Sequence, residues 1–158
     1  MIHPDHLREL IEEVLKQHGL YSKAAVELLM LTAAQESHCG RYLRQIKGPA
    51  LGIFQMEPAT YHDLWKNYIF YKYRIAEELN KYNVNSNNWR IHMIGNIPYQ
   101  ILIARVNYLR MPELLPDHND LRGLARYYKK YWNTYLGAAT IDEAMNNYYL
   151  YAVSNSKY

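Results

Sequence analysis

Hydrophobic side chains recur along this chain with the 3.6-residue period of α-helices, and short segments rich in polar residues, proline or glycine separate the periodic stretches. The first predicted helix spans residues 5–18, from a cap at Asp5 to a stop at Gly19. Its predicted inward face consists of Leu7, Leu10, Ile11 and Leu15. A second helix is predicted from a cap at Ser22 to a stop at Gly40.

A long third helix is predicted to start at Pro58 or Thr60, because Thr60 and Asp63 have nearly the spacing of a capping box. Its predicted inward face consists of Leu64, Trp65, Tyr68, Tyr71, Ile75 and Leu79. The asparagine-rich run 83–88 ends it. The remaining helices are bounded by Pro98 and Pro112, by Asn119 or Asp120 and about residue 133, and by a capping box of Thr140 and Glu143. About six helices and almost no strand pattern predict an all-α domain.

The second helix places a carboxylate on its apolar face. The positions that share this face are Leu28, Leu29, Thr32, Ala33 and Glu36. Burial raises the pKa of a carboxyl group toward neutrality, so that it retains a proton to donate at working pH. Glu36 is therefore the candidate general acid. The alternative is a glutamate at a helix end that simply turns to solvent.

An apolar segment with two glycines follows at residues 48–58. Prolines lie at both ends of this segment, which is therefore predicted to be extended or looped rather than helical. Gly52 permits close approach of the backbone, and Gln55 is a single amide in an apolar run. A buried acid facing such a segment suits general-acid chemistry in a cleft.

These residues carry a resemblance to a known family. Glu36-Ser37, followed by Ala-Leu-Gly-Ile-Phe-Gln-Met-Glu-Pro-Ala-Thr at residues 50–60, resembles the first two motifs of soluble lytic transglycosylases and goose-type lysozymes. It is most similar to short, single-domain versions encoded by bacteriophages. The resemblance implies an all-α, lysozyme-like fold that cleaves peptidoglycan glycan strands. It assigns catalysis to Glu36 and substrate contacts to Ser37, Gly52 and Gln55, although Gln55 also suits a structural amide.

The third motif of that family is only partly present. Its pattern is Ala-Tyr-Asn-x-Gly, and its tyrosine approaches the catalytic acid. Residues 125–128, Ala-Arg-Tyr-Tyr, keep the alanine and a tyrosine without the asparagine and glycine, and residues 131–133 are a looser second match. The resemblance therefore leaves Tyr127 and Tyr128 as equal candidates.

The number of acids decides the mechanism. Hydrolysis by the two-carboxylate route needs a second acid, for which Glu57 is the first candidate and Asp63 the next. Glu57 equally suits the start of the following helix. Since no second acid is obvious, the resemblance favours a lytic transglycosylase, which cleaves the β-1,4 bond between N-acetylmuramic acid and N-acetylglucosamine and forms a 1,6-anhydro product. A hydrolytic muramidase and a wall-binding or virion module without activity remain the alternatives.

Composition narrows the class of protein. The 158 residues, 49% hydrophobic and 21% charged, predict one globular domain over 1–158, which we expect to be a monomer. No apolar run reaches membrane length, and residues 1–6 do not read as a signal peptide. Combined with this, the resemblance to phage-encoded enzymes implies synthesis in the cytoplasm of a bacterial host and action on the cell wall, during lysis or from the virion. The net charge of +3 is too small to indicate nucleic-acid binding.

Other candidate sites are weaker. Cys39 with a nearby histidine suggests a thiol hydrolase, but a helix C-terminus disfavours a thiolate. The histidines lack metal-binding spacing, so no metal or other cofactor is expected. Seventeen tyrosines suit stacking on sugars or a wet, half-buried core. The basic residues of the 120–133 helix form either a solvated face or a wall-binding patch; they are Arg122, Arg126, Lys129 and Lys130.

Overall fold

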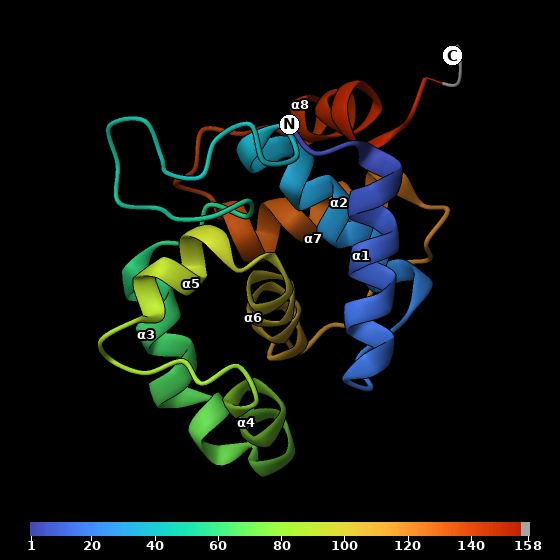
Figure 1. Ribbon diagram of the computed structural model, residues 1–158. Helices are drawn as coiled ribbons and strands as arrows, with labels where there is room; N and C mark the ends of the chain where they lie inside the picture. Colours follow the sequence, from blue (N-terminus) through green and yellow to red (C-terminus); the bar gives the residue numbers. More distant parts are fainter. Residues whose placement is uncertain (156–158) are drawn as a thin grey trace.

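The structure is a computed structural model that describes residues 1–155, and over this range it contains eight α-helices and no strand beyond two isolated bridges (Figure 1). The helices are α1 (Pro4–Gln17), α2 (Lys23–Ser37), α3 (Pro58–Asn67), α4 (Tyr73–Asn80), α5 (Trp89–Gly95), α6 (Ile97–Leu109), α7 (Leu121–Tyr128) and α8 (Ile141–Asn147). The predicted all-α class is confirmed for these residues. The expected number of about six helices is too low.

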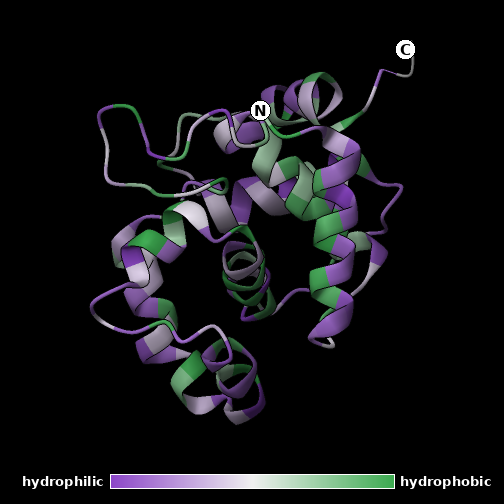
Figure 2. Ribbon diagram, in the orientation of Figure 1, coloured by the Kyte–Doolittle hydropathy of each residue, from purple (hydrophilic) through white to green (hydrophobic). Residues whose placement is uncertain are grey.

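Helices α2 and α6 form the centre of the molecule, because both are apolar on nearly every side. Figure 1 shows α6 end-on with the other helices around it, and α1, α2, α4 and α5 all contact it. Its residues 99–104 and 106–108 are all buried. A helix that is hydrophobic all round is stable only inside a core. By contrast, α1 is amphipathic, and Figure 2 shows its hydrophobic residues on the side turned toward the other helices.

Three predicted helix starts are confirmed by side-chain caps. The Ser22 side chain accepts a hydrogen bond from the Ala25 N–H, and Asp120 caps α7 in the same way. Thr140 and Glu143 form the predicted capping box of α8. Helix α1 differs, because its cap is His3 rather than Asp5: the His3 ring accepts from the Asp5 N–H, and Pro4 takes the first helical position.

The predicted long third helix is wrong, because the chain leaves α3 at Tyr68 (φ −137°, ψ −63°). A short 3-10 turn over Ile69–Tyr71 follows, and α4 then runs in a new direction. This break buries Ile69 completely, whereas Tyr71, predicted to face inward, is 72% exposed. The predicted capping box at Thr60 is also absent: α3 starts with Pro58 after Glu57, and no side chain caps it.

Helix α5 was not predicted. It follows the asparagine-rich loop as seven residues with no side-chain cap, and it packs against α6. Asn96, rather than Pro98, caps α6, since its side chain accepts from the Tyr99 N–H. Short π-helical turns, Lys129–Asn133 and Tyr148–Ala152, continue α7 and α8. The first of these turns carries the chain from α7 to the functional cleft described below.

Candidate active site

Glu36 lies in the last turn of α2, at the edge of the core. The other members of its predicted stripe are fully buried, and Glu36 is half-buried. The helix ends at Ser37, with His38 in the left-handed conformation (φ 51°), so the predicted stop at Gly40 comes slightly late. The sequence therefore places the acid correctly, at the end of a buried helix and beside an opening.

The segment facing Glu36 is looped, as predicted. Isolated bridges pair Arg44 with Leu51 and Leu51 with Met56. Gly52 has φ +78°, and a Cβ atom there would lie 2.3 Å from both Gln100 Oε1 and the Met93 carbonyl oxygen. Gly52 is thus required for packing of this loop on α6. It does not line the cleft, which corrects the predicted substrate contact.

Ser37 also has a different task from the predicted sugar contact. It is completely buried, and its Oγ donates to the Ile53 carbonyl oxygen (2.6 Å) and accepts from the Gly40 N–H (2.8 Å). The first bond joins the end of α2 to the loop at residues 48–58, and the second holds the turn directly after α2. Ser37 therefore holds the two halves of the motif together and does not reach the cleft.

Of the three residues predicted to contact substrate beside Glu36, Gln55 is the one that lines the cleft. Its backbone has φ 47°, and its side-chain Nε2 donates to the Gly52 carbonyl oxygen at 2.7 Å. This bond fixes the orientation of the amide. Gln55 therefore acts as a structural amide within the loop, and it also presents its side chain at the cleft surface.

A cleft of about 580 Å³ opens beside Glu36. Its walls come from the loop after α2, the start of α3, the end of α6 and the segment after α7. The lining side chains are mostly polar, and they include Gln45, Gln55, Glu57, Thr60, Asn107, Arg110, Tyr131, Trp132, Asn133 and Thr134. A cleft of this size lined by hydrogen-bonding groups suits a polar ligand such as a sugar chain.

The carboxyl group of Glu36 is poised to donate a proton. Burial raises its pKa from the ordinary value of 4.5 to about 7, because the charged form loses hydration. The hydrogen bond from the Tyr128 hydroxyl to Glu36 Oε1 (2.5 Å) lowers the pKa by a smaller amount. Near neutral pH the protonated and charged forms of Glu36 are thus both well populated.

The two candidate tyrosines differ in what their hydroxyl groups contact. Tyr128 is buried, bonds to Glu36 and has its own pKa raised by burial. Tyr127, its neighbour on the helix, points elsewhere: its hydroxyl donates to the Glu113 carbonyl oxygen at 2.8 Å. Of the two, only Tyr128 touches the candidate acid.

The candidate second carboxylates differ in position. Glu57 is exposed at the start of α3, yet it lines the same cleft as Glu36. Asp63 is outside the lining residues and accepts from Arg110 Nη1 (2.7 Å) and Asn67 (2.6 Å), which lowers its pKa. Of these two carboxylates, only Glu57 therefore lies where a ligand bound in the cleft would meet it.

An aromatic wall from residues 131–133, the looser second match to the third motif, completes the cleft. Trp132 lines it and packs on Tyr108 (ring centroids 5.1 Å apart) and Phe54 (6.5 Å). The hydroxyl of buried Tyr108 bonds to Thr32 (2.7 Å), one turn before Glu36 on α2. Aromatic faces of this kind stack well on sugar rings.

No protein-family model, curated protein or solved structure matches this chain. What the chain does must therefore be inferred from the motif residues and from the geometry of the cleft.

The other candidate sites have little chemistry. Burial raises the pKa of the Cys39 thiol to about 11, which disfavours the thiolate that a hydrolase needs. Within residues 1–155 no group of three His, Cys, Asp or Glu side chains is placed to hold a metal ion. None of the described helices is long and apolar enough to cross a membrane.

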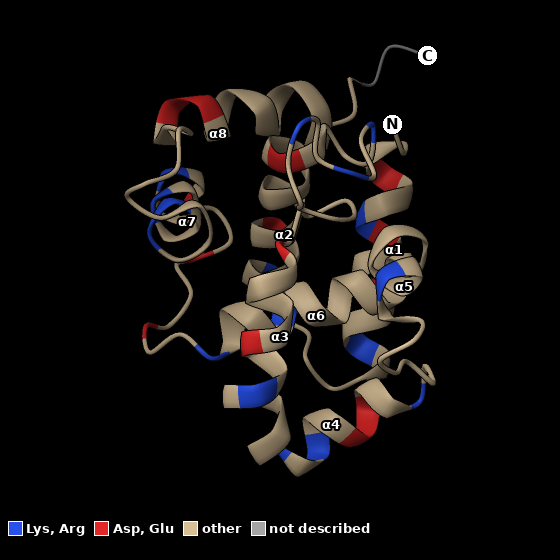
Figure 3. Ribbon diagram, turned by 90° about the vertical axis from the view of Figure 1, so that its left-hand side faces the viewer, with Lys and Arg blue, Asp and Glu red and all other residues tan. Residues whose placement is uncertain are grey.

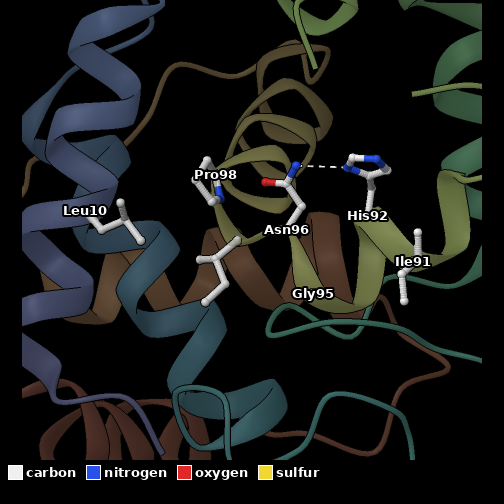
Figure 4. A pocket seen from close by; sticks show the side chains of 7 residues that line it. Leu10, Ile91, His92, Gly95, Asn96 and Pro98 are labelled. Atoms are coloured by element: carbon white, nitrogen blue, oxygen red, sulfur yellow. Dashed lines mark hydrogen bonds between the residues drawn. The ribbon is translucent and has the colours of Figure 1, made fainter. Parts of the chain in front are cut away.

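A depression of about 590 Å³ between α1 and α5 is lined largely by apolar side chains (Figure 4). The ring of His92, which also lines it, is hydrogen-bonded to the Asn96 side chain.

The basic face of α7 is exposed at Arg122, Arg126 and Lys130. Figure 3 shows this concentration of Lys and Arg on α7 and the acidic start of α8 nearby. Arg122 Nη1 lies 3.3 Å from Asp142 Oδ1, and Lys130 forms an ion pair with Glu113. Much of the face therefore has partners within the chain.

Proposed function

We propose that the protein is a peptidoglycan-cleaving enzyme in which Glu36 is the catalytic acid. The observation that carries this proposal is the carboxyl group with a pKa of about 7 beside a polar cleft of about 580 Å³. A general acid works best when its pKa lies near the operating pH. The Glu-Ser motif, the loop at residues 50–60 and the all-α class agree with a lysozyme-like enzyme.

In the proposed first step Glu36 protonates the leaving oxygen of the β-1,4 glycosidic bond. Tyr128 donates to Oε1, so the transferable proton resides on Oε2. The glycosidic bond breaks as the proton moves, and positive charge develops on the ring oxygen and the anomeric carbon. The half-buried position of Glu36 keeps its neutral form available for this step.

In the proposed second step the acetamido oxygen of the muramic acid residue attacks the anomeric carbon. Glu36, now charged, takes the proton of the sugar's 6-hydroxyl, and that oxygen attacks the anomeric carbon, which breaks the bond to the acetamido oxygen and restores the N-acetyl group. The product is a 1,6-anhydromuramyl end, no water is consumed, and Glu36 regains its proton. This route needs only one carboxylate and is the reaction of a lytic transglycosylase.

A second candidate is a hydrolytic muramidase, which the position of Glu57 favours. Its exposed carboxylate lines the same cleft and is available to activate a water molecule. The product would then be a reducing muramic acid end.

Product analysis separates these reactions. Purified peptidoglycan is digested with the protein, treated with borohydride and examined by mass spectrometry. Anhydro fragments, lighter by one water and resistant to reduction, are expected. Reducible fragments alone would establish hydrolysis. Co-sedimentation of the protein with an undigested wall would indicate a binding module without activity.

The biological setting we propose is a bacteriophage infection, on the resemblance to short phage-encoded enzymes. The protein would be made in the host cytoplasm and act on the wall during lysis or from the virion. Its partner in either case is the glycan strand.

A further inference from the structure

Unpaired polar atoms concentrate in the cleft. Among the described residues, four buried side-chain nitrogen or oxygen atoms have no hydrogen-bond partner. Two of these, Asn107 Oδ1 and Arg110 Nε, belong to side chains that line the cleft, in the last turn of α6 and at its C-cap. Buried polar groups normally find partners within the protein, so such exceptions need an explanation.

Asn107 is the more informative of the two. The residue is only 3% exposed, and within residues 1–155 its Oδ1 has no hydrogen-bond partner. The other buried amide of α6 behaves differently: Gln100 Oε1 accepts from the Ile53 N–H at 2.8 Å, and its Nε2 donates to the His92 carbonyl oxygen. Gln100 thus stabilises the fold, whereas Asn107 contributes no such bond.

The fold alone does not favour an asparagine here. The surrounding residues of α6 are apolar, and an amide left without partners in a core destabilises a protein relative to a hydrocarbon side chain. Because Asn107 lines the cleft, a group bound there can supply the partner that the described residues do not.

We propose that the carboxamide of Asn107 hydrogen-bonds an N-acetyl group of the bound glycan. A carboxamide offers one acceptor and one donor, and an acetamido group offers the matching N–H and C=O. Rotation of the amide plane by half a turn exchanges its oxygen and nitrogen, so either atom can face the ligand. This inference rests on the proposed function and deepens it, because it names the substituent that the cleft reads.

Arg110 supports a neutral polar ligand at this position. Its Nη1 is held by Asp63 at 2.7 Å, which offsets its charge, while its Nε lacks a partner.

The test measures binding rather than turnover, because the acetamido group also takes part in the proposed reaction. The Glu36→Gln protein is the parent, and Asn107→Leu is added to it. Binding to purified peptidoglycan is measured by co-sedimentation, before and after chemical N-deacetylation of the wall. We expect Asn107→Leu to weaken binding to the acetylated wall by about 3- to 10-fold, the loss of one hydrogen bond. Binding to the deacetylated wall should not change.

Controls separate this contact from a folding defect. Asn107→Leu should unfold at the same or a higher temperature than its parent, and Asn107→Ala should repeat the binding loss if the leucine overfills the site. Asn80→Ala, at the exposed end of α4, should bind both walls like the parent. An equal loss on both walls, or none on either, would overturn the role of Asn107. Failure of the parent to bind either wall would instead refute the proposed function.

Discussion

The Tyr128 hydroxyl donates a hydrogen bond of 2.5 Å to Glu36 Oε1 and so joins the last turn of α7 to the last turn of α2. This bond favours the charged carboxylate, whereas burial favours the neutral acid and has the larger effect. The pKa of about 7 is the balance of the two. Since one contribution comes from a single hydroxyl, mutation can remove it without removing the other.

Tyr128→Phe should therefore raise the pKa of Glu36 above about 7, because the ring still buries the acid but the hydroxyl no longer stabilises its charge. The alkaline limb of the activity profile should move up by about one pH unit. A pH–rate profile on purified peptidoglycan measures the shift of this limb. Tyr127→Phe, which loses only a bond to the Glu113 carbonyl oxygen, should leave the limb in place. A downward shift in Tyr128→Phe would contradict this account of the pKa.

Glu36→Gln should lose roughly 10²- to 10⁴-fold in the rate of glycan cleavage, because the amide keeps the shape but cannot transfer the proton. Turbidity loss of a wall suspension measures the rate, and circular dichroism checks the fold. Glu57→Gln is the matched comparison, since it changes the other cleft glutamate. If Glu36 is the single catalytic acid, Glu57→Gln should retain most activity. A comparable loss in Glu57→Gln would favour the two-carboxylate hydrolase.

Stability should also depend on Glu36. Its pKa is about 7 when folded and about 4.5 when unfolded, so the folded state binds more protons between these values. The stability associated with this group is complete below pH 4.5 and is lost as the pH rises to about 7. The full loss is of the order of 3 kcal/mol. At pH 8 Glu36→Gln should therefore unfold at a higher temperature than the wild type, and this advantage should vanish near pH 4. A lower unfolding temperature at pH 8 would mean that the carboxylate is well solvated.

Gly52→Ala should destabilise the protein by about 1–3 kcal/mol, because the new Cβ meets backbone and a bonded amide at 2.3 Å and φ is +78°. Urea denaturation measures the free energy of unfolding. Gly95→Ala is a suitable control, since nothing lies within 4 Å of its added Cβ. It should be neutral or slightly stabilising. Equal effects of the two substitutions would mean that the loop is not held against α6.

Thiol reagents should neither label nor inhibit the native protein, because Cys39 is fully buried and its pKa is raised to about 11. Labelling followed by mass spectrometry, with and without denaturant, provides the test. Modification in denaturant only is expected. Rapid inhibition of the folded protein would restore the thiol-hydrolase alternative.

The elements predicted correctly have local causes. Ser22, Asp120 and Thr140 cap helices through side chains that bond within three residues, and sequence spacing reveals such bonds directly. The failure at Tyr68 has a non-local cause. The helical pattern continues past it, but the chain bends there so that Ile69 enters the core, and a pattern read within one helix does not contain that information.

The same distinction applies to the site. Glu36 and Gln55 were found because each interrupts an apolar run. The choice between Tyr127 and Tyr128 depends on how α7 is rotated against α2, which only tertiary packing decides. Trp132 belongs to the looser match at residues 131–133, but the sequence assigns it no role, and Asn107 is not predicted at all. Asn107 had the same local signal as Gln55, a lone amide among apolar residues, but nothing in the sequence connected it with Glu36.

The cleft has walls from widely separated parts of the chain, and this has a consequence for protein synthesis. The helix bearing Glu36 is complete by residue 37, whereas the opposite wall includes residues 131–138. A nascent chain that ends before residue 128 holds the acid without its bond from Tyr128, and one that ends before residue 131 also lacks the opposite wall. The cleft therefore forms only after synthesis has passed residue 138, and chains terminated earlier lack part of its surface.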